Sequence, residues 1–270
     1  MGKFVVFYFI LVLVIGGLAY APWVLASYGM FPTDLVFPFV VIGGVSPTVA
    51  ALAVAKLEFG RGGAGYLFGQ FVRRGFSKLW FLVAILLPLS LAIGAVLLWS
   101  LVGGTFNLDL KFFEFIPILL TAFLMNMWEE VGWRGYSLPA LQKKYSALTS
   151  SLIVGVFWAL WHWPHFAVKD SVMAVNYQNF LWFAIFTLFY SVTYTWLYNS
   201  TKGSLLTVTL YHASTNTANT ILFVEGGIAV SVFPFYFLLV IVLALVVVFV
   251  FKQNFWSMGR VHIAPNPPSR

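Results

Sequence analysis

The stretch that decides the fold is residues 79–101, LWFLVAILLPLSLAIGAVLLWSL, which contains no charged side chain. A transmembrane α-helix needs about 20 consecutive, mostly apolar residues, and this stretch meets that requirement alone. Similar stretches recur along the chain. They predict eight spanning helices, at residues 4–25, 36–56, 79–101, 115–136, 150–168, 180–199, 204–223 and 232–251.

The composition of the whole chain agrees with a membrane protein. Of the 270 residues, 61% are hydrophobic, 19% are aromatic and only 9% are charged, and the mean hydropathy is +0.93. These values lie beyond those of soluble domains. We therefore predict an all-α, polytopic membrane helix bundle, with a single integral-membrane domain at 1–258 and a disordered cytoplasmic tail at 259–270. The chain has no cysteine, which excludes a thiolate nucleophile.

The distribution of Lys and Arg predicts the orientation. With eight spans, all of these residues except Lys111 and Lys169 fall on the side of the N-terminus. Because cytoplasmic loops accumulate Lys and Arg, we expect both termini in the cytoplasm. The net charge of +7 is then explained by anionic lipid headgroups, and no nucleic-acid partner is needed.

Two segments outside the spans are candidates for amphipathic helices in the membrane interface. Residues 57–78 mix glycines, aromatic residues and cations, which suits either such a helix or a basic loop. In residues 136–146, Leu138 and Leu141 could face lipid while Lys143 and Lys144 reach headgroups.

Ionisable residues at membrane depth are rare and mark functional sites. Glu129, Glu130 and Arg134 lie together near the end of the fourth span. Glu130 and Arg134 are four residues apart, so they share a helix face and can form an ion pair. Glu129 points about 100° away, which leaves it free to act as a general base. The alternative is a charge cluster that only anchors the helix end.

Two later spans carry histidines. His162 and His165 are three residues apart next to Pro164; we favour a functional role for His162 and a packing role for His165. His212, Asn216 and Asn219 form one helical stripe. Hydrogen bonding between helices explains Asn219 better than it explains His212 and Asn216. Carboxylates, imidazoles and an amide that converge from separate spans suit hydrolysis inside a membrane.

Taken together, these motifs resemble those of the type II CAAX prenyl proteases and their bacteriocin-processing and immunity relatives. That family carries two glutamates, three further residues and an arginine, then an aromatic-x-x-x-His motif, then His-x-x-x-Asn. Glu129, Glu130 and Arg134 match the first, and His212 with Asn216 match the third. In the second, Trp158 stands before His162 in place of the usual phenylalanine. The resemblance covers residues 115 to about 222.

The resemblance implies an intramembrane endopeptidase. Glu129 and His162 would activate water, His212 and Asn216 would stabilise the oxyanion, and Glu130 with Arg134 would support them. Many members are called metalloproteases, and Glu129, His162 and His212 could form a zinc site. We favour water activation without a cofactor, because the sequence lacks a helical HExxH pair.

Two other classes of protein remain open, a transporter or channel and a non-catalytic immunity protein. The substrate expected of the endopeptidase is a membrane-associated protein or peptide. A prenylated C-terminus is the eukaryotic precedent, but this compact chain looks like a prokaryotic member of the cytoplasmic membrane, whose substrates need not be prenylated.

Overall fold

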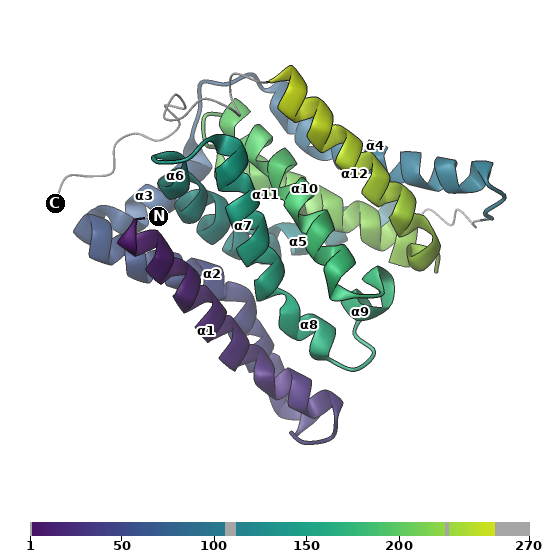
Figure 1. Ribbon diagram of the computed structural model, residues 1–270, viewed down its shortest axis with the longest axis horizontal. Coiled ribbons are helices and arrows are strands. Elements are labelled where there is room, and N and C mark those ends of the chain that lie inside the picture. The colour runs from purple at the N-terminus through teal and green to yellow at the C-terminus, as the bar shows by residue number, and fades with distance from the viewer. Residues whose placement is uncertain (1, 106–111, 225–226, 252–270) are drawn as a thin grey trace.

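The computed structural model describes residues 2–105, 112–224 and 227–251. Within these ranges the regular structure is entirely helical and contains no β-strand (Figure 1). The expected all-α membrane bundle is therefore confirmed. Lys111 and the tail expected at 259–270 lie outside the described residues.

Six of the expected spans are helices long and apolar enough to cross a membrane. A helix of about 20 residues covers roughly 30 Å, the thickness of the hydrocarbon core. These helices are α1 (Lys3–Ser27), α2 (Val36–Phe59), α4 (Leu79–Leu101), α5 (Phe112–Gly132), α10 (Phe180–Ser200) and α12 (Ala229–Val250).

The two remaining spans, expected at 150–168 and 204–223, are shorter helices, which corrects the expected number of eight. Both α7 (Ala147–Trp161) and α11 (Leu205–Asn219) have 15 residues. The first ends before Pro164 and is followed by α8 (Trp163–Ala167), while the second continues into η5 (Thr220–Val224), a π-helical turn. Both pack against longer helices, so they need not cross the lipid alone.

Short helices lie in both segments that were expected to form interfacial helices. Residues 57–78 contain the turns η2 (Gly60–Gly62) and η3 (Gly69–Val72) around α3 (Gly63–Phe68). The second segment contains η4 (Trp133–Ser137), a π-helical turn, and α6 (Leu138–Gln142). The other short elements are η1 (Thr33–Leu35) and α9 (Val172–Tyr177).

The expectation that Leu138 and Leu141 face lipid is wrong, because both are buried in the bundle. Polar contacts join this segment to the rest of the bundle. The amide of Asn199 donates to that of Gln142 at 3.0 Å, and the amide of Gln142 donates back at 3.3 Å. The Gln70 amide also donates to the backbone oxygen of Gly135 at 2.8 Å.

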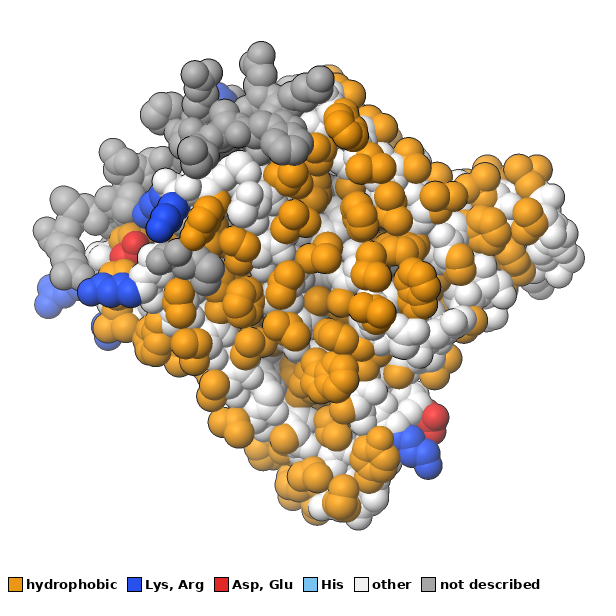
Figure 2. All heavy atoms as spheres, viewed as in Figure 1, with side chains coloured by type: hydrophobic (Ala, Val, Ile, Leu, Met, Phe, Trp, Pro, Cys, Tyr) orange, Lys and Arg blue, Asp and Glu red, His pale blue; other side chains and the backbone are white. Residues whose placement is uncertain are grey.

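The site helices lie in the middle of the bundle. Figure 1 shows α1 and α2 on one side, α4 and α12 on the other, and α7, α10 and α11 between them. Helix α11 packs against both α4 and α5, and most of its side chains are buried. The face in Figure 2 is largely apolar, and its Lys and Arg side chains gather mainly near the N-terminus.

Candidate active site

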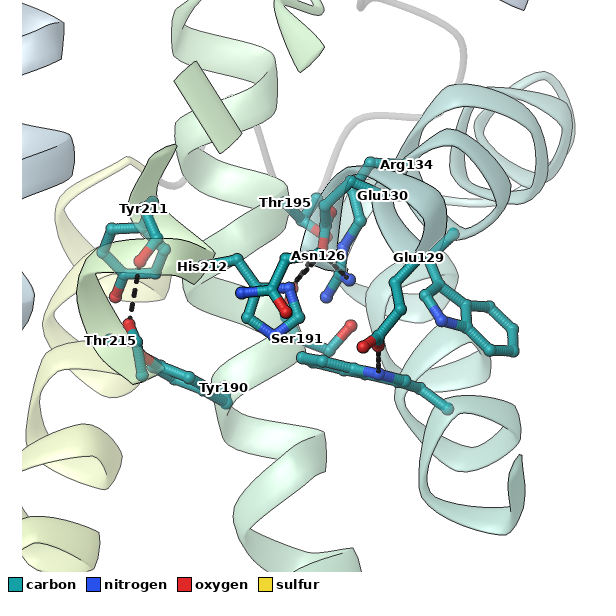
Figure 3. Close-up of polar contacts among 12 residues, drawn as sticks. Asn126, Glu129, Glu130, Arg134, Tyr190, Ser191, Thr195, Tyr211, His212 and Thr215 are labelled. Carbon is teal, nitrogen blue, oxygen red and sulfur yellow. Dashed lines mark hydrogen bonds and ion pairs between the residues drawn. The ribbon is translucent and has the colours of Figure 1, made fainter. Parts of the chain in front are cut away.

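Glu130 is the centre of a buried polar cluster between α5 and α11. Its Oε1 lies 2.9 Å from Nη1 of Arg134 and 2.9 Å from Nδ1 of His212 (Figure 3). All three side chains are buried. Because leaving one charge of such a group uncompensated destabilises a protein strongly, these contacts explain how a carboxylate can lie in the interior.

A second polar contact joins the same two helices one turn away. The Nδ2 of Asn216 donates to Oδ1 of Asn126 at 3.2 Å. Asn126 precedes Glu130 by four residues, and Asn216 follows His212 by four, so the helices run antiparallel and present matching stripes. We call the contacts Glu130–His212 and Asn126–Asn216 the α5–α11 ladder.

Glu129 lies on a different side of α5 from the ladder. Its Oε2 accepts a hydrogen bond from Nε1 of Trp158 at 2.9 Å (Figure 3). Glu129 and His162 are half-buried, and Asn216 is exposed. These three residues can therefore be reached from outside the protein, whereas Glu130 and Arg134 are fully buried and His212 is 5% exposed.

Trp158 contacts most of the cluster. Its ring and that of Tyr194 lie 4.3 and 4.2 Å from Cζ of Arg134, which places the guanidinium against two aromatic faces. The ring also meets His212 edge-on, with centroids 5.5 Å apart. The backbone oxygen of Trp158 lies 2.9 Å from Nδ1 of His162. This contact holds the His162 ring and leaves its Nε2 for other partners.

His165 lies in an aromatic environment next to His162. Its ring centroid is 4.7 Å from that of Tyr20, 5.0 Å from that of Trp23 and 5.5 Å from that of His162. This packing agrees with the role that we favoured for His165 from the sequence.

The backbone around the site depends on close packing between α2 and α5. A Cβ on Gly132 would lie 2.5 Å from the backbone oxygen of Pro47 and 2.5 Å from the hydroxyl of Tyr8. Only glycine therefore fits there. One residue after Pro47 on α2, Thr48 donates a hydrogen bond to the backbone oxygen of Trp128.

Both helices of the ladder end in π-helical turns, η4 after α5 and η5 after α11. Such turns are rare and occur often at functional sites. Arg134 lies within η4, yet its guanidinium still reaches Glu130 four residues earlier.

The zinc alternative requires Glu129, His162 and His212 to converge on one point. Within the described ranges, no group of three His, Cys, Asp or Glu side chains is arranged to hold a metal ion. In this arrangement one oxygen of Glu129 accepts from Trp158, and Nδ1 of His212 contacts Glu130. The residues therefore do not fit a metal site in this arrangement.

Helical spacing alone predicts the Glu130–Arg134 ion pair, which is present. It does not reveal that His212 contacts Glu130, 82 residues away. Sequence reasoning also missed the indole hydrogen bond of Trp158 and the part played by Asn126. A signal for Asn126 was available, because it is an amide one turn before Glu130 in an otherwise apolar stretch.

Comparisons with known proteins show what this part of the chain is similar to. Residues 111–218, which contain every residue of the ladder, match the family model described as type II CAAX prenyl endopeptidase, Rce1-like. This part of the chain is therefore similar to that family. A curated relative, CAAX prenyl protease 2 of Methanococcus maripaludis, is 29% identical over 149 residues, covering 53% of this chain and 52% of the relative. The chain thus spans about half the length of this CAAX protease relative.

Proposed function

We propose that this chain is an intramembrane endopeptidase that hydrolyses a peptide bond in a membrane-associated protein. The observation that supports this best is the difference between two adjacent carboxylates. Glu130 is buried and compensated by Arg134 and His212, whereas Glu129 keeps accessible surface and accepts from a neutral indole. A positioned, accessible carboxylate is suited to take a proton from water.

In the proposed reaction, Glu129 takes one proton from a water molecule while Nε2 of His162 accepts a hydrogen bond from the same water. The water oxygen then forms a bond to the carbonyl carbon of the substrate, and the carbonyl electron pair moves onto its oxygen. When the C–N bond breaks, Glu129 returns the proton to the leaving nitrogen. The products are a carboxylic acid and an amine, and transfer of the acid proton to the amine gives a carboxylate and an ammonium group, so atoms and charge balance.

His212 and Asn216 are the proposed donors to the oxyanion. Glu130 contacts Nδ1 of His212, which leaves the Nε2 side of the ring for the substrate oxygen. Asn216 has a second N–H besides the one given to Asn126. Donors of this kind typically contribute about 3 kcal/mol each to the transition state in other hydrolases. Glu130 and Arg134 would hold this arrangement without contacting the substrate.

The surroundings of the site suggest the substrate class and the orientation. Glu129 lies on a helix that is apolar and long enough to span a membrane, so we propose a substrate that is itself held in the membrane, prenylated or not. The matched relative is named a CAAX prenyl protease. We further propose that the cation-rich end faces anionic lipid on the cytoplasmic side of a prokaryotic cytoplasmic membrane, with both termini inside.

Terminal proteomics tests the proposed function directly. Membranes carrying the wild-type protein should contain new protein C-termini that are absent when Glu129→Gln is expressed at the same level. Glu114→Gln is a matched control, because Glu114 is an exposed carboxylate in the first turn of the same helix. An identical set of termini in wild-type and Glu129→Gln membranes would exclude the proposal and favour a transport or immunity function.

Chelation tests the metal requirement separately. Because the acceptors described above do not fit a metal site, cleavage should survive exhaustive treatment of the purified protein with 1,10-phenanthroline, and elemental analysis should show no stoichiometric zinc. Loss of cleavage that returns on adding zinc would replace this mechanism with a zinc site at Glu129, His162 and His212.

A further inference from the structure

We infer that Asn126 is a positioning residue that turns the amide of Asn216 toward the substrate. The side-chain oxygen of Asn126 would hold one N–H of Asn216, so that the other N–H faces the oxyanion. This inference rests on the proposed function and extends it to a residue outside the three motifs.

The geometry of the α5–α11 ladder supports this assignment. The Oδ1 of Asn126 accepts from Nδ2 of Asn216 at 3.2 Å, and an amide nitrogen carries two N–H groups. A side-chain amide that donates one N–H to a fixed acceptor has its second N–H fixed as well. Without Asn126, the Asn216 amide could rotate about its terminal torsion, which is broad.

Burial separates the roles of the two asparagines. Asn216 is exposed, so a substrate can reach it. The donor atom of Asn126, its Nδ2, is itself buried, so a substrate oxygen cannot contact it directly. Asn126 therefore acts through Asn216 and does not itself touch the reacting atoms.

The nitrogen of Asn126 argues against a purely structural role. Its Nδ2 is buried and has no hydrogen-bond partner among the described residues. A buried donor without a partner destabilises the folded state, and an apolar side chain of similar size would avoid this. An amide kept where it lowers stability is expected when that side chain serves activity.

A double-mutant cycle tests the inference on the full-length protein in detergent. The four proteins are wild type, Asn126→Leu, Asn216→Ala and the double variant, and the probe is a fluorogenic peptide that spans a cleavage site mapped by terminal proteomics. Asn126→Leu should lower kcat by about 100-fold, the typical effect of a small misplacement of a catalytic group. It should change KM little and leave Tm unchanged or higher.

In the Asn216→Ala background, Asn126→Leu should have no further effect on kcat, because a residue that acts only through Asn216 loses its role with it. Asn219→Leu is the matched control, since Asn219 lies three residues beyond Asn216 on α11 and should leave kcat unchanged. If Asn126→Leu does not fold, Asn126→Ala takes its place in the cycle.

Three results would overturn the inference. They are a wild-type kcat for Asn126→Leu, an equal loss of kcat in both backgrounds, and a lower Tm with unchanged kcat. If Asn216→Ala is slow while Asn126→Leu is normal, the inference fails and the proposed function stands. If Asn216→Ala itself cleaves at the wild-type rate, the proposed oxyanion role fails with it.

Discussion

Glu129 and Glu130 are neighbours in sequence but lie in different surroundings. Successive residues of a helix point about 100° apart, so Glu130 faces α11 and meets His212, while Glu129 faces Trp158. Glu130 also forms an ion pair with Arg134, whereas the partner of Glu129 is a neutral donor. This difference separates a supporting carboxylate from a candidate base.

Glu130→Gln should destabilise the protein strongly. The change keeps the size of the side chain but leaves the buried guanidinium of Arg134 without a counter-charge, and breaking such a pair costs about 3–5 kcal/mol. Thermal unfolding in detergent measures this loss. Glu114→Gln at the other end of α5 is exposed and should change stability by less than about 0.5 kcal/mol. A wild-type Tm for Glu130→Gln would contradict the buried ion pair.

Trp158→Phe should reduce activity with little effect on folding. Phenylalanine keeps an aromatic face against Arg134 but lacks the N–H that Trp158 donates to Glu129. A hydrogen bond to a charged group contributes about 1.5–3 kcal/mol, so kcat/KM should fall by roughly 10- to 100-fold. Trp163→Phe, which changes an exposed tryptophan in α8, should cleave normally. Equal rates for Trp158→Phe and wild type would remove the indole from the mechanism.

At the scale of helices, local spacing predicted some features and long-range packing decided others. The Glu130–Arg134 pair follows from a separation of four residues. In contrast, the burial of Leu138 and Leu141 depends on amides that belong to other elements. No periodicity within residues 136–146 contains that information. The approach of α2 to Gly132 is likewise a contact between distant segments.

Gly132→Ala should separate α2 from α5. The new Cβ would lie 2.5 Å from the backbone oxygen of Pro47, and a backbone atom cannot rotate away as a side chain can. We expect a loss of about 1–3 kcal/mol, seen as a lower Tm, together with reduced cleavage. Gly17→Ala in α1 has nothing within 4 Å of its Cβ and should be tolerated. If both variants are equally stable, the close contact is absent.

At the scale of the whole molecule, composition and hydropathy were sufficient for the fold class but not for the number of spans. Residues 150–168 and 204–223 both form helices, but neither helix runs the full length that we expected. Helix α7 ends before a turn at His162, and α11 ends before a π-helical turn that begins at Thr220. Backbone changes of this kind depend on neighbouring helices. The convergence of α5, α7 and α11 at the site also depends on the packing of neighbouring helices.

The orientation of the bundle is open to a labelling test, because the chain contains no native cysteine. Ser77→Cys and Lys169→Cys place single thiols at two exposed positions. The charge distribution predicts that an impermeant thiol reagent added to intact cells labels Lys169→Cys and spares Ser77→Cys until the cells are lysed. The reverse pattern would invert the topology and place the cation-rich end outside.

The most direct test of the account is the cleavage rate of purified Glu129→Gln protein on a peptide that spans a mapped cleavage site. Glutamine keeps the shape of Glu129 and can still accept from Trp158, but it cannot take a proton from water. The rate should fall by about 100-fold or more, while Tm stays at the wild-type value. A folded Glu129→Gln protein that cleaves the peptide at the wild-type rate would contradict the proposal that Glu129 activates the water.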